Sequence, residues 1–172
     1  MVLTDGLVQQ GFSLLDANMD DLDRYIEIKK ACYKKYMDEY NGGWIDDIQV
    51  VILTDGLKRM VESACCKKIL LNGMTVGFFS YGGQAEKIDG ISIQMLEEAR
   101  NKGMGSFYLN HITALSRQTG KPAYLVVHKS NPAEGLFRRF GFKVYDESRT
   151  HYLMSFNQEN ASDFSDYRKR LQ

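Results

Sequence analysis

The stretch ISIQMLEEARNKGMGSFYLNHI, residues 91–112, decides the fold of this chain. Its first part alternates, with Ile91, Ile93 and Met95 on one face, which is the period of a β-strand. From Met104 onward the apolar residues recur at helical spacing instead. A strand is therefore expected to lead through a basic, glycine-containing turn directly into a helix.

The turn from Arg100 to Gly105 has the composition of an anion-binding site. The first turn of a helix leaves backbone N–H groups without intrahelical partners, and the helix dipole adds partial positive charge there. Gly103 and Gly105 carry no side chain that would block these groups. Arg100 and Lys102 raise the positive potential. We therefore predict a phosphate- or pyrophosphate-binding turn, and the alternative is a glycine-rich turn without a ligand.

Composition favours one soluble domain. The chain has 172 residues, of which 44% are hydrophobic, and this is enough for one well-buried core. A formal net charge of +0 and a pI near 6.8 do not support a nucleic-acid or membrane partner. The sequence shows no membrane-length apolar run and no signal-peptide pattern, so a cytoplasmic location is expected. Three cysteines and three scattered histidines suggest neither a disulfide framework nor a metal site.

The pattern along the chain predicts strands and helices in alternation. The expected elements are a strand at 11–16, helices at 18–40 and 46–63, hairpin strands at 67–71 and 74–81, a strand at 88–96, a helix from 104 to about 118, a strand at 123–127, a short helix at 132–140, and strands at 142–145 and 150–156.

Several boundaries rest on particular residues. Asn18 is expected to cap the first helix and Asn41-Gly42-Gly43 to end it. Asn72-Gly73 marks the hairpin turn, and Gly82-Gly83 is expected to begin another turn. The opening of the second helix, IQVVIL, is equally compatible with a strand. Cys65 and Cys66 are expected to pack at the end of that helix rather than to act as nucleophiles.

Two motifs carry a resemblance to a known family. The turn reads R-x-x-G-x-G, which resembles the pyrophosphate loop of the GNAT superfamily, the acyl-CoA-dependent N-acetyltransferases. The stretch HKSNPAEGLFRRFGF, residues 128–142, resembles the N-P-A-x-x-L-Y-x-x-x-G-F motif of the same superfamily. It matches that motif at Asn131, Pro132, Ala133, Leu136, Phe137, Gly141 and Phe142. Two motifs in the right order and on the right elements identify the chain as a bacterial-type, single-domain member.

The resemblance implies the α/β (α+β) GNAT fold, in which a mixed sheet of about six or seven strands is flanked by about four helices. The implied element order is β-α-α-β-β-β-α-β-α-β-β, with residues 1–156 as the domain and 157–172 as a polar tail. The resemblance also implies acetyl-CoA as the cofactor and CoA as the product. The residues implied to bind it are Ile93, Met95, Arg100, Asn101, Lys102, Gly103, Met104, Gly105, Asn131, Phe137 and Arg139.

Each part of the cofactor has an implied partner. The backbone N–H groups of residues 101–105 would hold the pyrophosphate, and the edge of the strand at 91–95 would hydrogen-bond the pantetheine amides. Asn131 would contact the pantetheine arm. Arg138 or Arg139 would reach the 3′-phosphate, and the alternative is that both are solvated surface residues.

The sequence departs from the motif at Phe137, where many members carry the tyrosine that protonates the leaving thiolate. Phenylalanine has no hydroxyl, so that role is open. Because a thiol pKa is about 8.5, the CoA thiolate is a fair leaving group without an acid. The tyrosines that could supply one, unranked by the sequence, are Tyr108, Tyr124, Tyr145 and Tyr152.

The base is open as well. An alkylamine with a pKa of about 10.4 must lose a proton before it attacks, directly or through water. Glu86 and Asp89 lie at the start of the strand at 88–96, where some members carry a carboxylate, and His128 ends the next strand. For each of the three, an ordinary surface or strand-end residue is the alternative.

Two further segments resemble a bacterial GNAT subgroup. EYNGGWIDDIQ looks like its G-W-x-x-x-x-Q segment, and RTHYLM looks like its final-strand H-Y-x-M. Trp44, Gln49, His151 and Tyr152 would then lie near the acceptor. The alternative is that Trp44 packs between helices and His151 is an ordinary strand residue.

The function implied is transfer of an acetyl group from acetyl-CoA to a primary amine of a small molecule or peptide. Phe137 and the lack of a clear base motivate a second hypothesis, a catalytically weak acyl-CoA-binding regulatory module. A structural protein that uses the turn without a cofactor is the third. A homodimer through the last strands and the tail is a further expectation.

Overall fold

The computed structural model describes residues 1–40, 42–83 and 85–158. Its elements are α1 (Asp5–Gln9), β1 (Phe12–Asp16), the 3₁₀ turn η1 (Met19–Asp21), α2 (Leu22–Tyr40), α3 (Asp46–Ser63), β2 (Cys65–Leu71), β3 (Met74–Gly83), β4 (Ile88–Met95), the 3₁₀ turn η2 (Glu97–Ala99), α4 (Met104–Thr119), β5 (Ala123–His128), α5 (Ala133–Arg139), β6 (Lys143–Glu147) and β7 (His151–Phe156).

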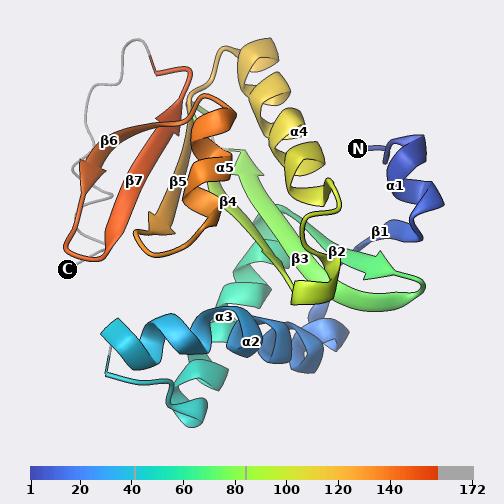
Figure 1. The fold of residues 1–172 in the computed structure, drawn as a ribbon, viewed down its shortest axis with the longest axis vertical. Coiled ribbons are helices and arrows are strands. Elements are labelled where there is room, and N and C mark those ends of the chain that lie inside the picture. The colour runs from blue at the N-terminus through green and yellow to red at the C-terminus, as the bar shows by residue number, and fades with distance from the viewer. Residues whose placement is uncertain (41, 84, 159–172) are drawn as a thin grey trace.

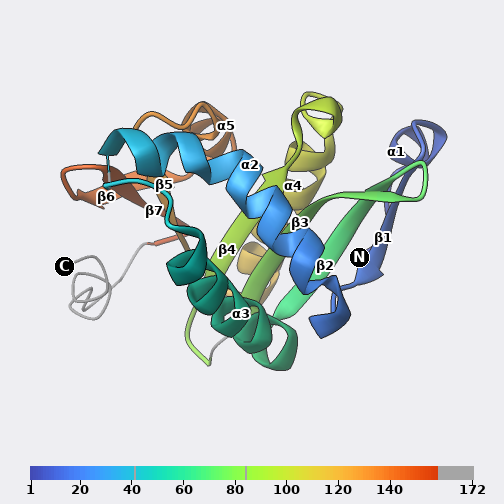
Figure 2. The same cartoon turned by 90° about the horizontal axis from the view of Figure 1, so that it is seen from below.

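The strands form one sheet in the order β1-β2-β3-β4-β5-β7-β6. Every neighbouring pair is antiparallel except β4 and β5, which are parallel. Helices α2 and α3 cover one face of the sheet, and α4 and α5 cover the other (Figures 1 and 2). The predicted mixed α/β architecture is confirmed, and its element order is preceded by one helix, α1, that the sequence did not predict.

Each face of the sheet has its own hydrophobic core. The larger core packs α4 and α5 against the sheet and includes Phe79, Tyr108 and Ile112. The smaller core lies under α2 and α3, where the ring of Tyr25 meets that of Phe78 edge-on at 5.2 Å. Each large apolar side chain buried in this way stabilises the fold by about 1.5–3 kcal/mol.

Strands β4 and β5 are joined at one end only. Ile88 and Ala123 form their one registered pair, next to a 2.9 Å hydrogen bond from Ile88 N to the carbonyl of Pro122. We call this junction the vertex. Beyond it the strands separate, so β4 from Ile91 onward has no hydrogen-bonded register with β5.

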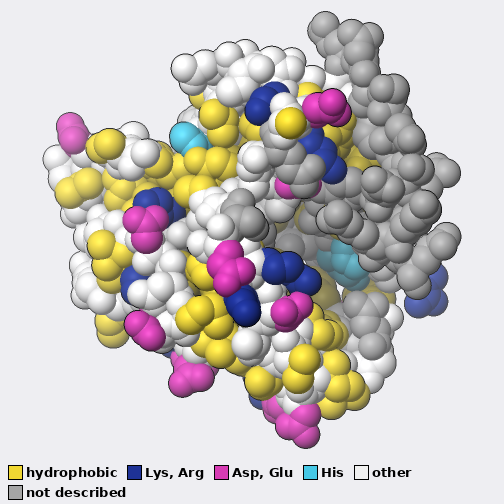
Figure 3. All heavy atoms as spheres, turned by 180° about the vertical axis from the view of Figure 1, so that it is seen from behind, with side chains coloured by type: hydrophobic (Ala, Val, Ile, Leu, Met, Phe, Trp, Pro, Cys, Tyr) yellow, Lys and Arg dark blue, Asp and Glu magenta, His cyan; other side chains and the backbone are white. Residues whose placement is uncertain are grey.

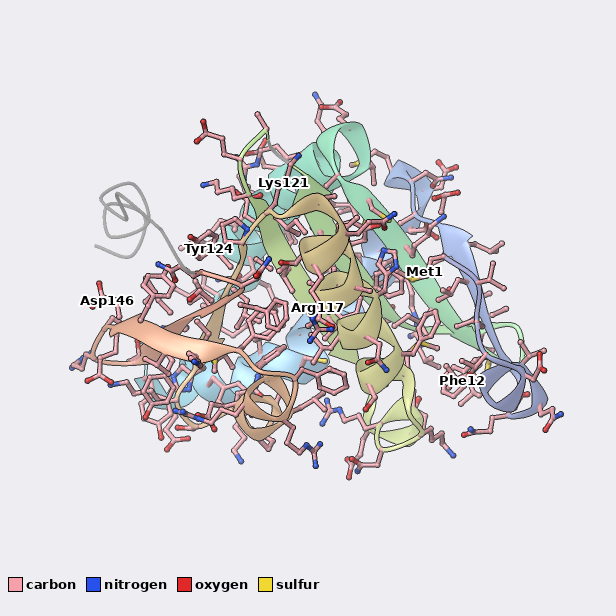
Figure 4. The ribbon with its side chains drawn as sticks, turned by 90° about the horizontal axis from the view of Figure 1, so that it is seen from above. Met1, Phe12, Arg117, Lys121, Tyr124 and Asp146 are labelled. Carbon is pink, nitrogen blue, oxygen red and sulfur yellow. The ribbon has the colours of Figure 1, made fainter. Side chains whose placement is uncertain are left out.

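Helix α4 spans the separated halves of the sheet. Its buried face includes Tyr108 and Ile112, which belong to the larger core. Seen from above, α4 lies across the sheet, with Arg117 labelled on it (Figure 4). The Arg117 guanidinium lies 5.0 Å from the ring centroid of Phe156 in β7, so the helix also contacts the C-terminal strands.

Local signals placed most boundaries correctly. Asn18 makes a capping box, because its Oδ1 accepts from Asp20 N and its own N–H donates to the Asp21 carboxylate. Asn72 and Gly73 have positive φ angles of 51° and 81°, as the predicted hairpin turn requires. Of the predicted Asn41-Gly42-Gly43 ending, Asn41 lies outside the described residues, as do residues 159–172 of the predicted tail.

The strand alternative for IQVVIL is wrong, since the segment lies in α3. In the helix, Gln49 is turned inward, whereas Val51 is 69% exposed. The β-branched residues therefore lie toward solvent. Their preference for strands reflects packing against neighbouring side chains, and such packing is missing at a solvent-exposed position. Figure 3 shows hydrophobic side chains gathered along the lower edge of the molecule, where this helix begins.

Two smaller expectations were also wrong. Cys65 and Cys66 do not end the helix but open β2, where they pair with Tyr81 and Ser80 of β3. Pairing with Asp89 and Ile88 of β4 carries β3 through Gly83, so Gly82-Gly83 does not begin the turn. The longer ladder satisfies more backbone groups than an earlier turn would.

Tyr108 connects α4 to an irregularity in the sheet. The register of β3 on β4 shifts between Ser80 and Gly82. The buried Tyr108 hydroxyl donates to the carbonyl of Ser80 at 2.7 Å and accepts from the N–H of Ser92 at 3.2 Å. Burial also raises the pKa of this phenol. The hydroxyl thus bonds two backbone groups of neighbouring strands beside the register shift.

We expect Tyr108→Phe to lower the free energy of unfolding by about 1–3 kcal/mol, because it removes the hydroxyl that bonds both backbone groups at a buried position. Urea denaturation measures this. Tyr81→Phe is the matched control: its hydroxyl lies 2.9 Å from His111 Nε2, but the pair is only partly buried, so a smaller loss is expected. Equal stability of Tyr108→Phe and wild type would contradict the bridging role.

Candidate functional site

A cavity of about 340 Å³ opens where β4 and β5 separate. Ile91, Ser92 and Ile93 form its β4 wall, and residues 126–128 form its β5 wall. Side chains from α2, α3, α5 and β7 complete it. The interrupted ladder therefore creates the space, and the surrounding elements supply its chemistry.

The turn between β4 and α4 has the geometry that the sequence predicted. Gly103 is the N-cap of α4 in the left-handed region, with φ 95° and ψ −11°. No side chain caps the helix and no acidic residue occupies its first turn, so its first N–H groups keep their capacity for an anion. A Cβ built on Gly103 would meet only Leu7 Cδ2, at 3.8 Å, so the turn is open.

Two residues of the turn have other contacts than expected. Arg100 folds back, with its Nε donating to the carbonyl of Met95 at 2.8 Å and its Nη2 lying 3.6 Å from Cys32 Sγ. A Cβ on Gly105 would lie 3.0 Å from Leu136 Cδ2, so this glycine allows α4 and α5 to pack closely. Asn101 and Lys102 are exposed, and Met104 is buried in the core.

Helix α5 and the segment just before it place two predicted residues at the cavity. Asn131 and Phe137 both line it. Asn131 Oδ1 accepts from the N–H of Ala133 at 2.9 Å, which leaves its NH₂ group as the end that can donate to a ligand. The buried Phe137 ring packs edge-on against Phe142 at 6.2 Å and offers no hydroxyl.

His128 presents a hydrogen-bond donor to the cavity. It ends β5 and is only 8% exposed. Its Nδ1 accepts from the N–H of Ser130 at 3.2 Å, so the neutral ring carries its proton on Nε2. That Nε2 is buried and has no partner among the described residues. Because a buried donor without an acceptor is costly, Nε2 is a group that a ligand would satisfy.

His151 lies beside it in β7. The two strands pair His128 with His151, and the rings meet edge-on with centroids 5.0 Å apart. His151 Nδ1 lies 2.9 Å from Thr150 Oγ1. Burial, followed by the neighbouring His128, lowers the pKa of His151, so its neutral form is favoured near neutral pH.

Another part of the cavity wall comes from α2, α3 and the segment between them. Lys29, Tyr33 and Tyr36 of α2 line the cavity together with the predicted Trp44 and Gln49. The rings of Tyr36 and Tyr40 lie 5.2 and 4.8 Å from that of His128.

Trp44 is fixed from both ends, because its N–H donates to Asp38 Oδ1 and its Nε1 to Asp46 Oδ1, each at 2.9 Å. A hydrogen bond from Lys34 is the main cause that lowers the pKa of the Asp38 carboxyl. A hydrogen bond from Lys30 does the same for Asp46. Both acceptors therefore remain charged carboxylates, which hold Trp44 at the cavity.

Several predicted residues do not line the cavity. Glu86 is exposed in the β3–β4 connection, and Asp89 lies near the vertex, where its carboxylate is 3.5 Å from Lys87 Nζ. Tyr145 packs against Tyr124 with ring centroids 5.7 Å apart. The others outside the lining are Met95, Arg100, Asn101, Lys102, Gly103, Met104, Gly105, Arg139 and Tyr152.

The described part of the chain has neither a metal centre nor a membrane-spanning helix. No group of three or more His, Cys, Asp or Glu residues there could hold a metal ion. None of the helices described is both long and apolar enough to cross a membrane.

The chain is similar to known proteins in sequence and in fold. The family model described as FR47-like protein matches residues 88–151, from β4 to the start of β7. A search among curated proteins finds no match.

Solved structures share the fold over most of the chain. The PaiA N-acetyltransferase from Thermoplasma acidophilum, in complex with coenzyme A, is 16% identical with a TM-score of 0.65, over 84% of this chain and 97% of its own. The ribosomal-protein-S18-alanine N-acetyltransferase from Escherichia coli is 15% identical with a TM-score of 0.61, over 89% and 97%. The yncA protein from Salmonella typhimurium, with its cofactor acetyl-CoA, is 18% identical with a TM-score of 0.58, over 88% and 97%.

Proposed function

We propose that the chain is a member of the GNAT superfamily and that it transfers an acetyl group from acetyl-CoA to a primary amine of a small molecule or peptide. The observation that carries the proposal is the buried His128 Nε2–H in the cavity between β4 and β5, together with the open N-terminus of α4 in the turn that follows β4. A donor without an acceptor and an uncapped helix are both suited to ligand oxygens.

The residues present fit the cofactor. The first N–H groups of α4 suit a pyrophosphate, since Gly103 keeps the turn open. The β4 edge from Ile91 to Ile93, which has no register with β5, suits the amides of the pantetheine arm. Asn131 adds the NH₂ donor. Coenzyme A and acetyl-CoA bound to structural neighbours support the same choice.

When bound, acetyl-CoA supplies an activated thioester, and the chain must orient it, stabilise charge on its carbonyl oxygen and remove a proton from the amine. We assign the donor role to His128, because its Nε2 already carries a proton and its Nδ1 is engaged by Ser130. A fixed N–H in a buried site is worth more than one in water, since no solvent must reorganise.

We assign the base to His151 rather than to Glu86 or Asp89. His151 lines the cavity, whereas neither carboxylate does. Its lowered pKa favours the neutral ring, which can accept the amine proton directly or through a water molecule. Phe137 donates nothing to the leaving thiolate, and a thiol pKa of about 8.5 makes an acid dispensable.

A thermal-shift titration with acetyl-CoA tests the cofactor site. At 100 times its dissociation constant the ligand should stabilise the wild type by about 2.7 kcal/mol. Gly103→Glu should lose this stabilisation, because a carboxylate would project at the anion site.

Gly120→Glu is the matched control, since Gly120 caps the other end of α4 with a positive φ of 68° and open space around it. This variant carries the same charge and a comparable backbone strain, yet it should respond to acetyl-CoA as wild type does. No response of the wild type at millimolar acetyl-CoA would overturn the proposed function.

An acyl-CoA-binding module without turnover is the second candidate. The hydroxyl-free Phe137 and the absence of Asp and Glu from the described residues that line the cavity favour it. A thermal response to acetyl-CoA without CoA release across a broad amine panel would select this candidate. The predicted homodimer stays a prediction.

A further inference from the structure

Lys29 is a cation in the cavity wall without an anionic partner among the described residues. It lies in the middle of α2, and its Nζ lies 5.3 Å from the ring centroid of Tyr25 and 5.0 Å from that of Tyr33. No carboxylate of the described residues comes within ion-pair distance of it. Burial raises the pKa of Tyr33 to about 12, so this ring remains a neutral phenol.

The charge of the cavity rests on this side chain. Lys29 is the one Lys, Arg, Asp or Glu among its lining residues in the described chain. Burial lowers the pKa of the ammonium to about 8, which shows how poorly the surroundings replace water around it. The rings of Tyr25 and Tyr33 compensate this only in part, because a cation–π contact is weaker than an ion pair with hydrogen bonds.

We propose that Lys29 binds a carboxylate of the acceptor, so that the substrate is an amine that also carries a carboxylate, of the amino-acid or short-peptide type. The inference rests on the proposed function and deepens it by naming the acceptor class. The acceptor would lie between two walls, with its carboxylate at α2 and its amine toward His128 and His151. Each charged end of such a molecule then meets a group that can bind it.

The same charge disfavours other amines. A diamine or polyamine would bring a second ammonium toward Lys29, and no carboxylate in the described part of the lining offsets the repulsion. The aromatic residues Tyr33, Tyr36 and Trp44 also line the cavity. An acceptor with an apolar or aromatic side chain suits this part of the cavity.

The experiment compares acceptors that differ only in the carboxylate. Amino acids are assayed beside their amides and their decarboxylated amines, for example phenylalanine, phenylalaninamide and 2-phenylethylamine. CoA release gives kcat/KM for each. A thermal-shift titration with the same compounds, in the presence of CoA, measures binding independently of turnover.

We expect the wild type to favour the carboxylate member of its best set by at least about tenfold in kcat/KM, about 1.4 kcal/mol. Lys29→Met has similar length and no charge, and it should abolish this preference while leaving the amide and the amine nearly unchanged. Lys29→Arg should retain most of it. Lys35→Met, at an exposed position of the same helix, should behave as wild type.

The outcomes separate the two proposals. Equal rates for acid, amide and amine, or an equal loss for all three in Lys29→Met, would overturn the carboxylate site alone. Failure of every probe to release CoA from a protein that binds acetyl-CoA would overturn the transferase function, and the carboxylate site with it.

Discussion

His128→Ala is expected to lower kcat by about 100- to 1000-fold, the range seen when one preorganised donor to a developing oxyanion is removed. The Nε2–H of His128 is buried and has no acceptor among the described residues. Ser130 fixes the tautomer through its N–H to Nδ1. The ring is therefore held as a donor before any substrate arrives, so alanine removes an interaction that the protein had already paid to orient.

His128→Gln separates a donor from a base. Its side-chain NH₂ can still donate, so a partial recovery of kcat over alanine is expected, whereas an amide cannot accept a proton as a base. Both variants should keep the acetyl-CoA thermal shift, which checks that they fold. Equal loss in both variants, together with loss of the acid limb of the kcat/KM profile, would assign the base to His128 instead of His151.

Gly77→Ala is expected to lower the free energy of unfolding by about 3 kcal/mol or more. Gly77 lies in β3 between Ile69 of β2 and Met95 of β4. A Cβ there would lie 2.5 Å from the carbonyl oxygen of Gln94 and 3.2 Å from Met95 Cα. These are backbone atoms of the neighbouring strand, so no rotamer change relieves the clash and β4 itself must move.

The matched control is Gly83→Ala at the end of the same strand, where a Cβ meets nothing within 4 Å. Urea denaturation should find this variant within about 0.5 kcal/mol of wild type. The Gly77 variant should also bind acetyl-CoA less tightly, because the carbonyl of Met95 holds the Arg100 side chain beside the turn. Wild-type stability in Gly77→Ala would contradict this prediction, because it would mean that β4 can move away from the added Cβ without a loss in the free energy of unfolding.

Sequence reasoning was most accurate where local physics determines the backbone. The change of period at residues 91–112, the Asn72-Gly73 turn and the Asn18 cap each depend on near neighbours, and all three are confirmed. The short helix α1 had no such signal. Its five residues allow little periodicity, and Leu7 is the one buried among them.

The site was harder to predict from the sequence, because its residues come from separate elements on both sides of the β4–β5 gap. Glu86 precedes β4 and Asp89 lies near its start. The cavity lies farther along β4, beyond the vertex. Lys29 was missed because a lysine in a helix is ordinarily a surface residue. A signal was present in the spacing: Tyr25 and Tyr33 stand four residues to either side, so all three share one face of α2.

The residues at the vertex control how β4 and β5 diverge. Ile91–Ile93 belong to β4 and His128 belongs to β5. The two strands are joined by Ile88, Ala123 and Pro122 at the vertex. A slight change of side-chain volume at this junction would displace the far ends of β4 and β5 more than the junction itself, and with them the groups that line the cavity. Catalytic speed could therefore be adjusted by evolution, or by a protein engineer, from positions that never touch a substrate.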